Sequence, residues 1–520
     1  MPPIDYHKKK FLIIEDHAEF RSSVKAIMRL LGASMIDTAN NGNEGISKII
    51  SNQYNIILSD YELGKGKDGQ QVLEETRHSG LLKSSSVFIL VTAATTVEMV
   101  MGALEYEPDG YITKPITHDN LHLRLDKIVL EKNIFKKIDA AIDSKKYKIA
   151  INECDNIIKE KPKYKIKALR IKSKLLLKLE YYAEAEKLFK EVIEMRDIPW
   201  ARLGLGKTAY FNNNLDSALA IFTKLAEEDT RNVEAYDWIS KINLSQGNPI
   251  AAQEALQHAI KRSPKSILRQ MELANIAKTN EDWPVSEVAF RKSVNLGKDS
   301  CYKSPNNYSS LVQVLQHTLK NASGRKLKDA TNEASRILDS LEKEFSDNHE
   351  MQVFSKVLRA EMESNLGKVE DAKRLLEEIQ GEIKSLPGQI SEDMAMSLAN
   401  VYEATGNDSE SKKLRDKYKN TPVSEILNND GVRYFKSGNI KEALSVFTKA
   451  AKEPDASSSV LLNVVQALIK TIELEGVNEE LVESCGRYFS RMENIDSDDK
   501  NYSRYKKLYS IYQSVSSASH

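Results

Sequence analysis

Five polar residues in the first 115, at four places along the chain, have types and a spacing that could form one acidic pocket. An acid pair, Glu15 and Asp16, is followed by Asp60, Thr92 and Lys114, and the intervals from Asp16 onward are 44, 32 and 22 residues. Each of these residues ends or closely follows a short apolar run. If the runs are parallel strands of a doubly wound sheet, their carboxyl ends meet at one crevice and the side chains converge there. Clustered carboxylates repel one another unless a cation joins them, and Mg²⁺ is the hard cation that suits oxygen ligands.

The elements that must position these residues can be read from the apolar pattern of residues 11–130. The apolar runs are short, rich in β-branched residues and nearly continuous, and they cover residues 11–14, 36–38, 55–59, 87–92 and 110–113. Segments with helical spacing lie at 18–31, 42–52, 69–77, 96–106 and 118–130. Strands buried on both faces that alternate with helices predict an α/β fold with a doubly wound, five-stranded parallel sheet.

The motifs at the ends of these runs resemble the receiver domain of two-component response regulators. The matching segments are FLIIEDH, NIILSDYELGKGKDG, VFILVTAA and DGYITKPI, and the resemblance covers residues 9–131. It implies a flavodoxin-like receiver domain at residues 1–131. It also implies that the chain is a response regulator, a phosphoprotein of a two-component system.

The resemblance assigns a role to each residue of the acidic pocket. Asp60 would be the phosphoacceptor, which takes a phosphoryl group from a histidine kinase or a phosphotransfer protein. Asp16, Glu15, Asp60 and the backbone carbonyl of Glu62 would hold Mg²⁺. Asp60, Lys114 and Thr92 would then be the catalytic residues of phosphoryl transfer.

The same resemblance assigns the residues that respond to phosphorylation. Lys114 and Mg²⁺ would neutralise charge on the phosphoryl oxygens, and most of the catalysis would be positioning and electrostatics. Thr92 would move toward the acyl phosphate and Tyr111 would turn inward with it, while a cis peptide before Pro115 would hold the lysine loop. No enzymatic activity is expected beyond Mg²⁺-dependent self-phosphorylation and slow autodephosphorylation.

Beyond residue 130 the chain shows helical spacing and an internal repeat. Small residues that align at Ala150, Ala185, Ala218, Ala252 and Ser286 are separated by 35, 33, 34 and 34 residues. A hairpin pattern with a period near 34 resembles the tetratricopeptide repeat.

Later repeats follow this pattern less regularly. Their aligned small residues are Ala330, Ala372, Ser411 and Ala443. Gly247, Gly367, Gly406 and Gly438 each precede an aligned residue by five positions. We expect an all-α solenoid of about nine hairpins over residues 132–512, with capping helices at its end, and a disordered tail at 513–520.

Arrays of this type bind protein segments on their concave face. Six residues would project toward that groove: Trp200, Lys207, Tyr210, Asp237, Trp238 and Lys241. The two tryptophans are the candidate anchors, since buried aromatic residues dominate binding energy. The strong alternative is that the small and aromatic residues of the repeats only form the core.

The junction between the two halves contains neither proline nor glycine from residue 116 to residue 161. The last receiver helix could therefore run directly into the first repeat, which predicts a rigid junction. Phosphorylation would reset the receiver face formed by residues 95–131. That face would dock on the array, or on a second receiver in a homodimer, in one state only.

Composition narrows the functional classes. The 75 basic residues balance the 75 acidic ones, so we expect no nucleic-acid or membrane partner. The three cysteines, Cys154, Cys301 and Cys485, lie far apart and suggest a reducing, cytoplasmic compartment. His17 is expected to be a solvated or structural residue rather than a ligand.

The favoured function is a signalling adaptor in which phosphorylation controls protein binding by the array. A phosphorylation-independent scaffold that uses the receiver as a docking module is one alternative, and indirect control of transcription is another. A concealed catalytic site in the array and direct DNA contact are less favoured, because residues 131–520 show no catalytic motif and no basic recognition helix.

Overall fold

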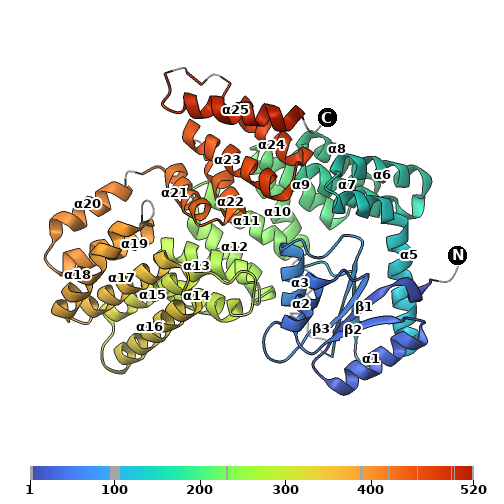
Figure 1. Cartoon of the computed structure of the whole chain (residues 1–520), viewed down its shortest axis with the longest axis horizontal. Helices are drawn as coiled ribbons and strands as arrows, with labels where there is room; N and C mark the ends of the chain where they lie inside the picture. Colours follow the sequence, from blue (N-terminus) through green and yellow to red (C-terminus); the bar gives the residue numbers. More distant parts are fainter. Residues whose placement is uncertain are drawn as a thin grey trace. The chain divides into compact units, whose positions relative to one another are not determined.

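A computed structural model describes residues 4–93, 106–229, 232–386, 390–419, 421–453, 455–493, 495–496 and 498–517. The chain forms two compact units, Met1–Asn307 and Tyr308–His520. The first unit contains the sheet and the first helical hairpins, and the second unit is helical in its described part (Figure 1).

The first unit begins with the five-stranded parallel sheet that the sequence predicts. Its strands are β1 (Lys10–Ile14), β2 (Met35–Ala39), β3 (Ile56–Asp60), β4 (Val87–Thr92) and β5 (Gly110–Thr113). Their order in the sheet is β2-β1-β3-β4-β5, and every adjacent pair is parallel. A short 3-10 helix, η1 (Tyr6–Lys8), precedes the first strand.

Helices cover both faces of the sheet, which explains why the central strands read as continuous apolar runs. The described helices here are α1 (Ala18–Leu30), α2 (Gly42–Ser51), α3 (Gly69–His78) and α5 (His118–Asp143). Residues of α1 and α5 share one core with the sheet, whereas residues of α2 and α3 share the other. The helix expected at 96–106 lies outside the described residues except for Tyr106.

Helix α5 joins the sheet domain to the first hairpin without interruption, as the lack of proline and glycine predicts. Its first half packs on the sheet through Leu121 and Leu125. Its second half packs on α6 through Phe135 and Ile138, which share a core with Ala150. One helix of 26 residues therefore belongs to both parts of the first unit.

The remaining helices of the first unit form successive hairpins. They are α6 (Tyr147–Glu160), α7 (Lys165–Lys178), α8 (Tyr182–Met195), α9 (Pro199–Phe211), α10 (Leu215–Glu228), α11 (Val233–Ser245), α12 (Pro249–Arg262), α13 (Ile267–Thr279) and α14 (Trp283–Gly297), with a 3-10 turn η2 (Pro162–Tyr164) before α7. The five aligned small residues all lie on the second helix of a hairpin and are completely buried. Small side chains at this position let the two helices approach closely.

The second unit continues the hairpin pattern. Its helices are α15 (Pro305–Asn321, which begins just before the unit), α16 (Gly324–Glu344), α17 (His349–Asn365), α18 (Val369–Ser385), α19 (Glu392–Ala404), α20 (Asp408–Lys419), α21 (Val423–Lys436), α22 (Ile440–Ala450), α23 (Ser458–Glu475), α24 (Glu479–Ser490) and α25 (Tyr502–Ser517). The four later aligned residues are buried here as well. The expectation of a disordered tail from residue 513 is wrong for 513–517, because α25 continues to Ser517, and 518–520 lie outside the described residues.

One backbone feature recurs at the turn inside the hairpins. The residue five positions before the aligned small residue has a positive φ in eight hairpins: Lys145, Glu180, Asn213, Gly247, Glu281, Gly367, Gly406 and Gly438. Four of these residues are not glycine, and their side chains make this conformation unfavourable. The recurrent turn therefore extends beyond the four hairpins in which glycine marks it.

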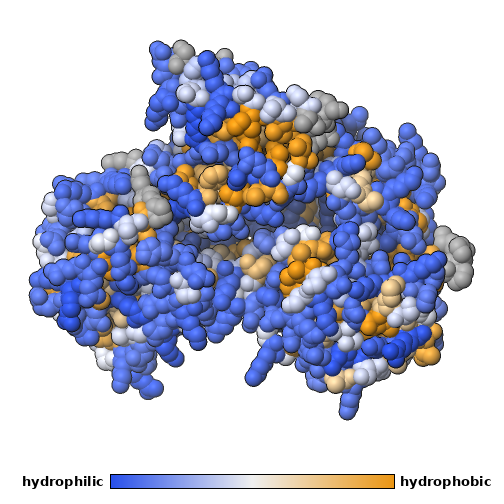
Figure 2. Space-filling view, viewed as in Figure 1, coloured by the Kyte–Doolittle hydropathy of each residue, from blue (hydrophilic) through white to orange (hydrophobic). Residues whose placement is uncertain are grey.

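The surface seen in Figure 2 is mostly hydrophilic, and its hydrophobic residues gather in several groups, the broadest over α23 and α24. Within the described part of the chain, no helix is long and apolar enough to cross a membrane.

Candidate functional site

The polar residues that the spacing singles out do meet at the carboxyl edge of the sheet. Glu15 follows β1, Asp60 ends β3, Thr92 ends β4, and Lys114 follows β5. The backbone N–H of Lys114 donates to the carbonyl of Thr92 at 2.7 Å, which fixes the lysine beside the end of β4.

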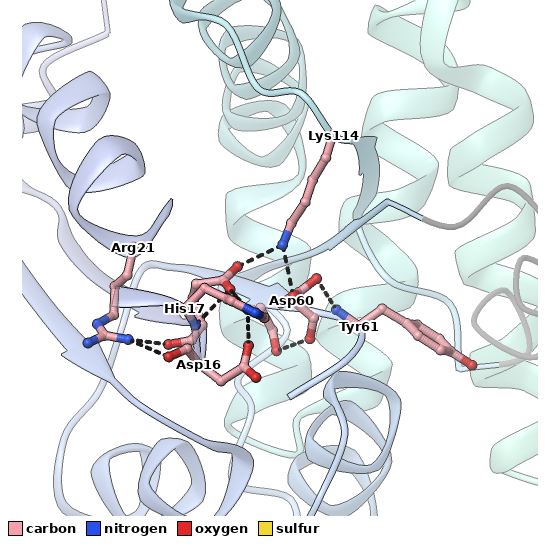
Figure 3. A network of polar contacts seen from close by, with 8 residues as sticks. Asp16, His17, Arg21, Asp60, Tyr61 and Lys114 are labelled. Atoms are coloured by element: carbon pink, nitrogen blue, oxygen red, sulfur yellow. Dashed lines mark hydrogen bonds and ion pairs between the residues drawn. The ribbon is translucent and has the colours of Figure 1, made fainter. Parts of the chain in front are cut away.

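Lys114 connects two carboxylates at the centre of the pocket (Figure 3). Its Nζ donates to Asp60 Oδ2 at 2.9 Å and to Glu15 Oε2 at 3.0 Å. The ammonium also lies 4.1 Å from the centre of the Phe20 ring, which belongs to α1. Asp60 Oδ1 accepts the backbone N–H of Tyr61 at 2.9 Å, so both oxygens of Asp60 have partners.

The pocket holds more acid than base, and this affects the ionisation of Asp60. Burial raises the pKa of Asp60 to about 6; Lys114 acts to lower it and Glu15 acts to raise it. Burial lowers the pKa of Lys114, but its hydrogen bonds to Asp60 and Glu15 outweigh this and leave the pKa raised. Lys114 therefore stays protonated and cannot fully compensate its two buried acidic neighbours.

The donor set fits a hard divalent cation. Ligand atoms of Glu15, Asp16 and His17 lie within 4.8 Å of one another, and Glu15 is almost completely buried. The loop after Asp60 approaches the same place, since a Cβ atom on Gly64 would lie 3.1 Å from Asp16 Oδ2. Buried carboxylates that one lysine cannot neutralise are the arrangement in which Mg²⁺ binds through oxygen.

Two of the residues considered for this site have exposed side chains. The side chain of Glu62 is exposed, and its predicted role as a metal ligand through the backbone carbonyl stays a prediction. His17 Nδ1 lies 2.9 Å from Asp16 Oδ1 with its ring largely exposed. The hydrogen bond that the His17 ring donates to Asp16 raises the pKa of His17.

The expected switch pair lies on adjacent strands: Thr92 is the last residue of β4 and Tyr111 is the second residue of β5. Burial raises the pKa of Tyr111, and a side-chain hydrogen bond with Thr92 opposes the shift. Arg124 of α5 donates to the carbonyl of Tyr111 at 3.0 Å. The peptide bond between Lys114 and Pro115 is cis.

The six expected groove residues fall into two groups. Trp200, Lys207 and Asp237 line a cavity of about 820 Å³ formed largely by the first helices of successive hairpins, α7, α9, α11 and α13. The other three residues, Tyr210, Trp238 and Lys241, do not line that cavity and pack against one another. Tyr210 and Trp238 pack edge to face at 5.2 Å, and Lys241 lies over both rings. Trp238 also stacks on buried Phe222, so its role includes packing.

Sequence reasoning missed the residues that connect the pocket region to the array. Lys67, in the loop after Asp60, donates to the carbonyl of Asp299 at 2.5 Å. Buried Glu74 of α3 accepts from Ser300 at 3.0 Å. Lys265 lies 5.3 Å from the centre of the Tyr61 ring, and Tyr61 directly follows Asp60. These contacts join residues about 200 positions apart, and no local motif marks them.

A second set of contacts joins the loop before β5 to α7. Glu107 accepts from Arg170 at 2.8 Å and from Lys174 at 2.5 Å. The preceding residue, Tyr106, donates through its hydroxyl to Glu74. The only sequence signal for this contact is the composition of α7, which contains six basic residues and no acidic one.

Comparisons with known proteins agree with both halves of this architecture. Residues 11–126 match the family model of the response regulator receiver domain, and residues 233–266 match that of the tetratricopeptide repeat. The transcriptional regulatory protein DltR of Streptococcus agalactiae serotype III is 31% identical over 116 residues, which are 22% of this chain and 50% of DltR. The chemotaxis protein CheY-3 of Vibrio cholerae is 29% identical over 119 residues, 23% of this chain and 90% of CheY-3.

The chain thus spans about half the length of DltR, and the similarity covers 22% of this chain. Among solved structures, a CheY-like receiver domain protein from Methanospirillum hungatei JF-1 is 26% identical, covers 24% of this chain and 96% of its own, and has a TM-score of 0.22. The protein therefore carries, at its N-terminus, a receiver domain of the kind found in two-component signal transduction, followed by a long array of helical hairpins that includes a tetratricopeptide repeat.

Proposed function

We propose that the chain is a response regulator that accepts a phosphoryl group on Asp60 and that its phosphorylation state controls protein binding by the helical array. The observation that carries the proposal is the convergence of Asp60, Lys114 and Glu15 at the carboxyl edge of the sheet. A histidine kinase or a phosphotransfer protein would supply the phosphoryl group.

In the proposed reaction, a carboxylate oxygen of Asp60 attacks phosphorus as the bond from phosphorus to the donor imidazole breaks. The imidazole keeps the electron pair of that bond and then takes up a proton. Lys114, held 2.9 Å from Asp60, would shift from the carboxylate to an oxygen of the incoming phosphoryl group. Mg²⁺, held by Glu15, Asp16, Asp60 and the carbonyl of Glu62, would neutralise further charge on that group.

The response would begin at Thr92 and Tyr111. The acyl phosphate carries ~1.5–2 negative charges where the Asp60 carboxylate carried one, and the Thr92 hydroxyl would turn toward it. Tyr111 would move with its partner, and the loop before β5 would follow. Glu107 in that loop is paired with Arg170 and Lys174, so the movement would alter a contact with the array. The proposal includes no catalytic activity beyond Mg²⁺-dependent self-phosphorylation and slow autodephosphorylation.

A second candidate function is a phosphorylation-independent scaffold in which the receiver serves as a docking module. The contacts of Lys67 with Asp299 and of Glu74 with Ser300 favour it, because they attach the receiver to the array without any phosphoryl group. In this case the receiver would be a fixed structural part of the first unit.

Intact mass spectrometry separates the two candidates. The full chain is incubated with Mg²⁺ and acetyl phosphate, beside Asp60→Asn and beside a sample with EDTA. The proposal predicts the mass of one added phosphoryl group in the wild type only, and only with Mg²⁺. An unmodified wild type, with acetyl phosphate and with a panel of histidine kinases, would contradict the proposal and favour the fixed scaffold.

A further inference from the structure

The cavity of about 820 Å³ on the first unit is lined by α7, α9, α11 and α13, and its charges are not distributed evenly. Two of its cations are paired with acids of the array itself. Lys207 pairs with Glu234 at 2.5 Å. Arg269 forms a two-point contact with Asp237, at 2.6 and 2.9 Å. Both partners of each pair belong to the array.

The cations at the α7 end of the cavity are different, because their partner belongs to the receiver. Arg170 and Lys174 share one acidic residue, Glu107, which reaches them from the loop before β5. Glu107 has a φ of 46°, a strained backbone conformation for a residue with a side chain. The receiver thus places one carboxylate on two cations of the array.

Another carboxylate can replace Glu107 in its ion pairs with Arg170 and Lys174, because all three side chains are accessible to solvent. The side chains of Glu107, Arg170 and Lys174 are 47%, 46% and 55% exposed while they are paired. Ion pairs at such exposed positions contribute little to stability, so another carboxylate can replace Glu107 at low cost. Burial acts to raise the pKa of Glu107, but Lys174 and Arg170 outweigh it and hold the pKa below its usual range.

Next to these cations the cavity wall is apolar. Leu177 of α7, Phe189 of α8, and Trp200 and Leu203 of α9 line it. A ligand that fits both features carries a carboxylate beside apolar side chains. A nucleic acid fits less well, because its phosphates recur along the whole strand and would also lie near Glu234, Asp237 and Glu272, whereas the peptide needs an anion only at Arg170 and Lys174.

We infer that this cavity binds an acidic peptide segment of a partner protein, whose carboxylate takes the place of Glu107 on Arg170 and Lys174. Glu107 then acts as an internal competitor that the receiver holds in the site. The inference deepens the proposed function by naming the class of partner. It rests on that function only in assuming that the array binds protein, not on phosphorylation of Asp60.

The test uses the full, unphosphorylated chain and a random peptide display library. Peptides are first selected for binding to the Glu107→Gln variant, which lacks the internal competitor. Peptides that also bind the double variant Arg170→Gln/Lys174→Gln are then removed, because they bind elsewhere on the chain. We expect the selected peptides to combine Asp or Glu with Leu, Phe or Trp. By fluorescence anisotropy, the strongest should bind Glu107→Gln about two- to fivefold more tightly than wild type, as expected for the loss of an exposed ion pair.

The matched control is Lys172→Gln, a substitution on the same helix at a residue that pairs with Asp155. The inference requires that Arg170→Gln/Lys174→Gln weaken binding at least tenfold while Lys172→Gln changes it less than twofold, with circular dichroism showing all variants folded. It is overturned if no peptide is selected, if the selected peptides lack acidic residues, or if both substitutions act equally. Because no step needs Asp60, a failed phosphorylation experiment leaves this result interpretable.

Discussion

The receiver pocket and the helical array use charged residues in different ways. In the pocket, the largely buried side chain of Lys114 is shared by two buried acids, Glu15 and Asp60. In the array, charges such as Lys207 and Glu234 form separate pairs with exposed members. A shared, undercompensated cluster stores electrostatic free energy for chemistry, whereas separate surface pairs contribute little and can be exchanged. Single residues should therefore dominate the behaviour of the pocket, and repeated positions should dominate that of the array.

The largest expected effect tests the pocket side of this comparison. Lys114→Ala should lower the rate at which acetyl phosphate modifies Asp60 by about 10²–10³-fold, the usual loss when one aligned electrostatic stabiliser is removed. Rates are measured by intact mass over time. Lys48→Ala, which removes a lysine that pairs with Glu44 on α2, is the control and should react at the wild-type rate. Equal rates for the two variants would show that the pocket does not depend on Lys114.

The second prediction concerns a buried acid where α5 passes from the receiver to the array. Burial raises the pKa of Asp139 from 3.8 to about 6; Lys132 opposes the shift, and Asp143 adds to it. Because the folded state holds the proton more tightly, the free energy of unfolding falls as pH rises from 3.8 to about 6 and stays low above that pH.

Asp139→Asn should therefore stabilise the first unit at pH 7.5 by up to ~3 kcal/mol, and the gain should disappear near pH 4. Denaturant melts of both proteins, followed by circular dichroism between pH 4 and pH 7.5, measure this. A gain that does not change with pH would mean that burial of the charge is not its cause.

The third prediction tests packing between hairpins. A Cβ atom on Gly204 would lie 2.1 Å from Phe189 Cζ, so Gly204→Ala should destabilise the array by ~1–3 kcal/mol. Gly381→Ala, inside α18, is the matched control because nothing lies within 4 Å of the new methyl group. It should stabilise its helix by up to ~1 kcal/mol. Thermal melts that show equal effects would contradict close packing at Gly204.

The smallest effect is expected at the recurrent left-handed turn. Glu281 has a φ of 58°, and the substitution Glu281→Gly should raise the free energy of unfolding by ~1 kcal/mol. Gly247 occupies the equivalent turn with a φ of 75°, and Gly247→Ala should lower the free energy of unfolding by a similar amount. Backbone strain would be the cause, since no atom lies within 4 Å of the added Cβ. Melting temperatures of the two variants should move in opposite directions. Changes of the same sign would mean that backbone strain does not control this position.

The sequence predicts the receiver well because its signals are local. Each strand contains a short apolar run, and Glu15, Asp60, Thr92 and Lys114 stand where those runs end, so their meeting follows from the topology of a parallel sheet. The hairpins of the first unit can be predicted equally well, because a small residue recurs there every 33–35 residues and is buried each time.

Other features depend on tertiary placement and leave little local trace. The contacts of Lys67 with Asp299 and of Glu107 with Arg170 arise only when the array folds back to the receiver. The turn at Glu180 has no such local signal, because glycine is the usual sign of a positive φ and glutamate occupies the position here. The repeat register alone predicts which residues face the groove, and it does not separate Trp200, which lines the cavity, from Trp238, whose ring stacks on Phe222.

The most direct test of the account is hydrogen exchange on the full chain with Mg²⁺, with and without acetyl phosphate, beside Asp60→Asn. We predict that phosphorylation changes the exchange of the receiver and also of α7 and residues 296–302, where the array contacts Glu107, Lys67 and Glu74. Asp60→Asn should show neither change. Exchange that changes only within residues 11–126 would contradict control of the array by the receiver.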